Sequence, residues 1–225
     1  MRLDRRMARA LFAATALAAV AVVVVVATTR TKHSDDNASL RDFLALTNRR
    51  ESASWLVHFR FERRLGAGSH FAQSITEANR PPVHVLSGGG TVTVDFGDHV
   101  ASCASTPKGP RCSNQKSSPA LAPAAVYRVA TSLGGYTVHR APSRTIAGEQ
   151  AQCFRLVAKP GHTEPSLGDE TLQCYAADGV PLRSELHRGA TVDSREAVAV
   201  QRHVSAAAVN ALLRQLDEKQ AGSGR

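Results

Sequence analysis

Residues 170–189 read ETLQCYAADGVPLRSELHRG, and this stretch decides the fold. An Asp-Gly pair between two alternating segments is a strong signal for a β-hairpin. With a two-residue loop, the register pairs Ala177 with Val180, Tyr175 with Leu182 and Cys174 with Arg183. One face then carries Tyr175, Val180, Leu182 and Leu186, and the other carries Cys174, Arg183 and Glu185. The hairpin is expected to belong to an antiparallel sheet with one buried face.

The flanking segments extend this pattern to residues 136–204, where strands and turns alternate. Further upstream, SWLVHFRFERRL alternates apolar and polar residues, as expected for a strand with one apolar face. We expect short helices at residues 39–48 and 124–133, a surface loop at 105–123, and a last helix capped by Ser205. The fold class is therefore α+β, with an antiparallel sheet that curls around helices so that one face is covered.

Two phrases of the sequence resemble a known family. Y-x-V…T-I-A-G-x-x-A-x-C-F begins at Tyr136, and C-Y-A-A-D-G-V-P-L-R-S-E begins at Cys174. Together with RPPVHVLSGGGTVTVDFGDHVASCA, they resemble exported actinobacterial proteins related to the LolA/LppX/RseB superfamily, over about residues 38–216. The resemblance implies a curved half-barrel closed by helices around an apolar cavity. Relatives hold acyl chains of lipids or lipoproteins there, and the RseB branch restrains an anti-sigma factor.

This chain departs from those relatives in two ways. Several lipid carriers are lipoproteins, but the first cysteine here is Cys103, so no lipobox cysteine precedes the domain. An RseB-like protein carries a second C-terminal domain, whereas we expect one extracytoplasmic domain in this sequence. These departures leave transport and sensing as open alternatives.

The N-terminal segment is expected to anchor the chain in a membrane. Residues 11–29 contain no charge, and nineteen apolar and small residues can cross a bilayer as a helix. Four arginines precede them, which places residues 1–10 in the cytoplasm and the rest of the chain outside. A cleaved signal peptide with a mature N-terminus at Thr28 is the alternative. Residues 30–37 then form a stalk, 38–216 an extracytoplasmic domain, and 217–225 a flexible tail.

Four cysteines in an exported chain suggest two disulfides. We expect local pairing, Cys103 with Cys112 and Cys153 with Cys174. Zinc is the alternative use of four cysteines, but the sequence has no C-x-x-C pair and no H-E-x-x-H motif. No metal and no cofactor are therefore expected.

The charge pattern and the motifs weigh against nucleic-acid binding and against catalysis. The formal net charge is +9, but the basic residues are scattered, which suits mild attraction to anionic headgroups better than nucleic-acid binding. No G-x-S-x-G elbow occurs. Ser113 to Lys116 matches S-x-x-K without its companion motifs, so chance explains it.

A lipid-binding cavity would be lined by apolar side chains of the sheet's concave face. The candidates share alternating positions in predicted strands, and they are Trp55, Phe59, Phe61, Tyr175, Leu182 and Leu186. A filled core demands the same alternation as a hollow one, so the sequence leaves both open. The favoured function is a membrane-tethered, non-catalytic protein that binds a lipid or another hydrophobic ligand. The alternative is a regulatory domain that binds another cell-envelope protein.

Overall fold

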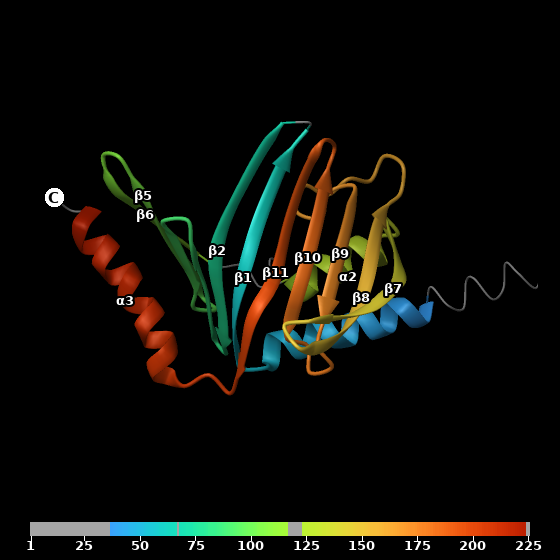
Figure 1. Ribbon diagram of the computed structural model, residues 1–225, viewed down its shortest axis with the longest axis horizontal. Coiled ribbons are helices and arrows are strands. Elements are labelled where there is room, and N and C mark those ends of the chain that lie inside the picture. The colour runs from blue at the N-terminus through green and yellow to red at the C-terminus, as the bar shows by residue number, and fades with distance from the viewer. Residues whose placement is uncertain (1–36, 67, 117–122, 224–225) are drawn as a thin grey trace, which may run out of the picture. The chain divides into compact units, whose positions relative to one another are not determined.

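The computed structural model describes residues 37–66, 68–116 and 123–223 of the chain (Figure 1). Residues 39–225 form a compact unit built on one curved, eleven-stranded antiparallel sheet with the order β6-β5-β4-β3-β2-β1-β11-β10-β9-β8-β7. The strands are β1 (Trp55–Leu65), β2 (Ser69–Arg80), β3 (Val83–Gly88), β4 (Thr91–Asp95), β5 (His99–Thr106), β6 (Gly109–Lys116), β7 (Tyr136–Ile146), β8 (Glu149–Ala158), β9 (Glu170–Tyr175), β10 (Pro181–Arg188) and β11 (Thr191–Arg202). Helix 37–52 precedes them, α2 (Pro123–Ser132) follows β6, and α3 (Ala206–Ser223) ends the described chain. The structure therefore has the predicted α+β class.

One face of the sheet, called here the inner face, is covered by helix 37–52 and α2. Phe43 of helix 37–52 lies 5.0 Å from Tyr127 of α2, 5.5 Å from Phe154 of β8 and 6.2 Å from Tyr175 of β9, between ring centroids. All four rings are buried, and large aromatic side chains supply much of the apolar area that such a core removes from water. This cluster packs both helices against strands β8 and β9.

Helix α3 covers the opposite face at the other end of the sheet. Val209 and Leu216 of this helix pack in one core cluster with Val85, Val92 and Leu56 of the strands. Because Leu56 alternates with Trp55 and Val57 along β1, it points to the face that helix 37–52 does not cover. Helix 37–52 and α2 thus cover one face of the sheet at the β7 end, and α3 covers the other face at the β6 end. Each helix layer removes the apolar side chains beneath it from water.

The hairpin between β9 and β10 follows the expected register only in part. Cys174 opposes Arg183 as predicted, but Tyr175 opposes Pro181 because a bulge lies between Pro181 and Arg183. The N–H of Ala176 donates to the oxygen of Val180 at 2.9 Å, so the turn is wider than a two-residue loop. Gly179 has a φ of +88°, and a Cβ there would lie 2.6 Å from the backbone nitrogen of Arg50. The turn is therefore shaped by its contact with the end of helix 37–52, which local sequence does not reveal.

Three other boundaries differ from the sequence-based expectations. Residues 109–116, expected in a surface loop, form the edge strand β6, where Pro110 is tolerated because edge positions need no donor on the solvent side. Helix 37–52 continues past Asn48 to residue 52. Helix α3 extends to Ser223, so residues 217–223 are helical rather than a flexible tail.

The structure contains both predicted disulfides. Cys103 and Cys112 are paired positions of β5 and β6, and Cys153 and Cys174 are paired positions of β8 and β9. Each bond therefore joins neighbouring strands directly opposite each other. The second pair is fully buried, which links it to the core of the domain.

The predicted membrane span at residues 11–29 lies outside the described residues, as do residues 1–10 and most of the predicted stalk. Within the described ranges, no helix combines the length and the apolar composition that crossing a membrane requires.

Candidate functional site

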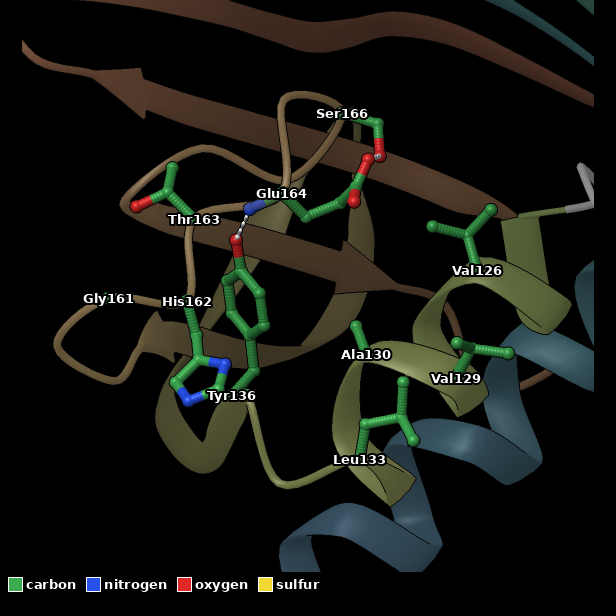
Figure 2. Close-up of a pocket in the computed structure, with 11 residues that line it drawn as sticks. Val126, Val129, Ala130, Leu133, Tyr136, Gly161, His162, Thr163, Glu164 and Ser166 are labelled. Atoms are coloured by element: carbon green, nitrogen blue, oxygen red, sulfur yellow. Dashed lines mark hydrogen bonds between the residues drawn. The ribbon is translucent and has the colours of Figure 1, made fainter.

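The largest pocket that we describe is a groove between α2 and the loop that joins β8 to β9 (Figure 2). Its volume is about 650 Å³, within the range of small-molecule sites. We call it the α2 groove. Its lining residues are Val126, Val129, Ala130, Leu133, Gly135, Tyr136, Gly161, His162, Thr163, Glu164 and Ser166.

The loop wall of the groove is held in place by Tyr136, the first residue of β7. Its hydroxyl donates to the oxygen of Gly168 at 2.6 Å and accepts from the N–H of Glu164 at 2.9 Å. Burial raises the pKa of Tyr136, so the phenol stays protonated and keeps its role as a donor. Leu167, buried in the core beside Tyr136, anchors the same loop. These contacts hold the loop wall of the groove in a fixed position against the sheet.

The helix wall of the groove is apolar and open to solvent. Val129 projects from α2 and is 55% exposed, and Leu133, in the turn directly after α2, is 77% exposed, although Tyr127 on the helix is buried. Figure 2 shows Val126, Val129 and Leu133 on the helix side of the groove and the polar side chains on the loop side. Leaving two large aliphatic side chains in water is unfavourable, so this wall suits an apolar occupant.

Polar groups gather along the loop wall. Ser166 Oγ donates to Glu164 Oε1 at 3.2 Å, and His162 lies beside Tyr136 in Figure 2. The arrangement can contact the polar end of an amphiphile while α2 contacts its hydrocarbon part. Over the residues that the structure describes, no group of three or more His, Cys, Asp or Glu side chains is placed to hold a metal ion.

The six cavity candidates of the sequence do not line the α2 groove. Trp55, Phe59, Tyr175 and Leu182 are at most 1% exposed and form parts of the packed core, whereas Phe61 and Leu186 are partly exposed. By strand register all six project to the inner face. The inner face is therefore filled where helix 37–52 covers it and more open toward the end of β1.

Replacing Leu182 with tryptophan is expected to destabilise the domain by about 1–3 kcal/mol, because the larger ring overpacks a fully buried site. The matched control is Val198→Trp, since Val198 is 63% exposed and an added ring there meets solvent. Urea denaturation measures the free energy of unfolding of both variants. Equal stability of the two variants would show that the space around Leu182 is hollow.

A buried ionic cluster lies between helix 37–52 and the sheet. Glu77 of β2 is 1% exposed, and its two carboxylate oxygens accept from Arg50 at 2.6 Å and from Arg195 of β11 at 2.5 Å. His84 Nε2 lies 3.0 Å from the same carboxylate. Burial alone raises the pKa of Glu77, but the charges of Arg195 and Arg50 and the contact with His84 lower it well below its usual range. The carboxylate is therefore ionised and connects the helix to two strands.

A second, smaller pocket of about 230 Å³ lies beside this ionic cluster. Its walls include Arg50, Trp55 and His84. Arg50 is held by Glu77, and Asn79 donates to the oxygens of residues 50, 51 and 53. These polar groups are satisfied within the fold, which indicates a structural role for the ionic cluster.

Sequence reasoning missed both the α2 groove and the ionic cluster. The signal for the groove was present in AAVYRVATSLGGY at residues 124–136, where apolar residues occur on more than one side of a short helix. The signal for Glu77 was weaker, because a single acidic residue in a strand usually points to solvent.

No protein-family model and no curated protein matches this chain. Among solved structures, it is similar to the MucA/MucB complex of Pseudomonas aeruginosa, with 14% identity and a TM-score of 0.46, covering 78% of this chain and 60% of that one. It is also similar to the Mycobacterium tuberculosis lipoprotein LppX, with 12% identity and a TM-score of 0.39, covering 76% of this chain and 98% of LppX.

A LolA superfamily protein from Nitrosomonas europaea is similar with 8% identity and a TM-score of 0.33, covering 73% of this chain and 95% of that protein. Two of these structures thus carry the names LolA superfamily protein and LppX, to which the resemblance of the sequence also pointed. The chain spans about three fifths of the length of the MucB-containing structures.

Proposed function

We propose that this protein binds the hydrocarbon part of a lipid or another amphiphile in the α2 groove, without catalysing a reaction on it. The observation that carries the proposal is an open groove of about 650 Å³ in which Val129 and Leu133 remain largely exposed. Each methylene that leaves water for such a wall contributes about 0.8 kcal/mol. An acyl chain that covers both side chains therefore gains affinity from the α2 wall alone.

The polar loop wall supports an amphiphile over a purely apolar ligand. His162, Glu164 and Ser166 lie opposite the apolar side chains of α2. Hydrogen bonds from such groups orient a ligand whose hydrocarbon part supplies most of the binding energy. The ligand would then lie with its polar end toward the β8–β9 loop.

We further propose that the domain acts outside the cytoplasm, tethered to the cell membrane by one helix at residues 11–29. The uncharged span and the arginines before it support the anchor. The two disulfides support a location of the domain in an oxidising compartment. Mass spectrometry of the native protein is expected to find an intact N-terminus, and a mature N-terminus at Thr28 would contradict the anchor.

A second candidate function is the binding of another cell-envelope protein on the same face of α2. The exposure of Val129 and Leu133 suits an apolar segment of a partner as well as an acyl chain. The lipid-binding function predicts that the isolated protein binds a simple amphiphile, and the partner-binding function does not.

Leu133→Glu is expected to weaken the binding of a fluorescent fatty acid by at least about tenfold, because it removes an apolar contact and puts a charge in its place. Leu133 is 77% exposed, so the fold should tolerate the change. Val198→Glu is the matched control, since Val198 is similarly exposed and does not line the groove. Titration of the full chain, exchanged from detergent into an amphipathic polymer so that no free detergent competes for the groove, measures all three proteins. If the unmodified protein does not bind, or if both variants bind equally well, the protein-partner function replaces the lipid function.

A further inference from the structure

Two hairpins turn at the same end of the sheet. Leu65 at the end of β1 is paired with Thr191 at the start of β11, and the N–H of Gly66 donates to the oxygen of Ala190 at 3.0 Å. The β1–β2 turn therefore lies directly beside the β10–β11 turn, as the upper edge of Figure 1 shows. We call residues 60–66, 68–71 and 187–193 the hairpin tip.

The hairpin tip exposes apolar side chains. Leu65 is 49% exposed and Phe71 is 52% exposed, although both belong to long, well-paired strands. Phe71 is paired with Arg63, and its ring lies 6.3 Å from the ring of Phe61. By alternation along the strands, Phe61, Leu65 and Phe71 project to the same face of the tip. An aromatic and aliphatic patch at a protruding turn is typical of a contact surface.

Basic side chains lie on both faces of the tip, with Arg63 on the face of the apolar patch and Arg64 on the other. The tip contains four arginines and two carboxylates, a net charge of +2 with its histidines neutral. Arg63 and Arg188 both pair with Asp193, so one carboxylate is shared by two cations. Arg60 pairs with Glu62, while the exposed Arg64 has no ion-pair partner among the described residues. Asp169 lies beside the tip and accepts from the N–H of Gly189. The tip therefore keeps a positive excess next to its apolar patch.

We propose that the hairpin tip docks on an anionic membrane surface. Phe71 and Leu65 would enter the interfacial region of the bilayer, and Arg63, Arg64 and Arg188 would lie at the level of the lipid phosphates. Apolar and aromatic side chains beside arginines are the combination that binds a charged bilayer surface. Arginine also contacts phosphate through two parallel hydrogen bonds, which lysine cannot form. The docking is independent of what occupies the α2 groove.

The test uses the full chain reconstituted into vesicles, with Phe71→Trp as the reporter. The vesicles contain phosphatidylcholine with brominated acyl chains, alone or mixed with phosphatidylglycerol. The one native tryptophan, Trp55, is fully buried and gives the same background in every variant. Val198→Trp is the matched control, because residue 198 is exposed and lies seven residues from Thr191 along β11. That distance is about 23 Å in an extended strand.

In anionic vesicles, bromine is expected to quench the Phe71→Trp reporter at least about twofold more than the Val198→Trp reporter. Adding Arg64→Glu to the Phe71→Trp protein should reduce docking at least about fivefold, because one cation near an anionic leaflet contributes about that factor. Quenching that is equal at both positions, or that does not depend on phosphatidylglycerol, would overturn the proposal. If Leu133→Glu lost fatty-acid binding but left the quenching of the Phe71→Trp reporter unchanged, ligand binding in the groove and membrane docking by the tip would be independent.

Discussion

Glu77→Ala is expected to lower the free energy of unfolding by about 3–5 kcal/mol, because it leaves the buried Arg50 and the partly buried Arg195 without their shared carboxylate. Arg50 comes from helix 37–52 and Arg195 from β11, so the substitution removes both the link of the helix to β2 and the side-chain link between β2 and β11. Chemical denaturation at neutral pH measures the change.

Glu62→Ala is the matched control for this variant. Glu62 forms its ion pair with Arg60 at 2.7 Å, but 65% of the Arg60 side chain is exposed, so water screens the pair. Exposed pairs of this kind contribute about 0–1 kcal/mol. Similar losses in the two variants would contradict a structural role for the ionic cluster.

The pH dependence of stability should follow Glu77 in the acidic range. Burial disfavours its charged form, but Arg195 and Arg50 outweigh burial and hold the pKa of Glu77 well below its usual range. The unfolded chain therefore takes up a proton at a higher pH than the folded domain does. The stabilisation is complete above the ordinary glutamate pKa and is lost as the pH falls toward the folded value. Glu77→Gln should flatten this acid limb in denaturation curves recorded at successive pH values, and an unchanged slope would contradict the assignment.

Removing the disulfide between Cys153 and Cys174 by a double alanine substitution is expected to cost about 3 kcal/mol, mostly because the unfolded chain gains freedom. The bond closes a separation of 21 residues, and both cysteines are at most 1% exposed. Their loss also leaves space in a cluster with Ile146 and Ala151, which adds a packing cost. Urea denaturation of the oxidised protein and of the variant measures the difference.

The disulfide between Cys103 and Cys112 serves as the comparison. Its sequence separation is 9 residues, so the same chain-entropy relation gives about 2.5 kcal/mol. Cys112 lies on the edge strand β6 and is only partly buried, so less packing is lost. If removing Cys103–Cys112 lowered the free energy of unfolding more than removing Cys153–Cys174, the predicted order of the two disulfides would be contradicted. Non-reducing peptide mapping should find both bonds in the unmodified protein.

Much of the strand pattern was predictable because side-chain alternation is local. The alternation of Trp55, Val57, Phe59 and Phe61 predicted both the strand and its buried face. The structure confirms the strand and the burial from Trp55 to Phe59, but it also buries Leu56 on the other face. Residues 109–116 were not recognised as a strand, because an edge strand rich in polar residues lacks that alternation. The pairing of Tyr175 was wrong by one position, since contact of Gly179 with helix 37–52 widens the turn.

The sequence by itself determined the α+β class and the strands around Asp178 and Gly179, and it favoured the local pairing of the four cysteines. These features depend on residues close together in the chain, whose spacing is visible in the sequence. Only the tertiary structure placed β11 between β1 and β10 and so brought Arg195 to Glu77, 118 residues away. It alone packed the β8–β9 loop beside α2 to form the groove, while helix 37–52 filled the inner face at Tyr175. The sequence shows which side chains must leave water, but which of them meet depends on how distant strands and helices pack.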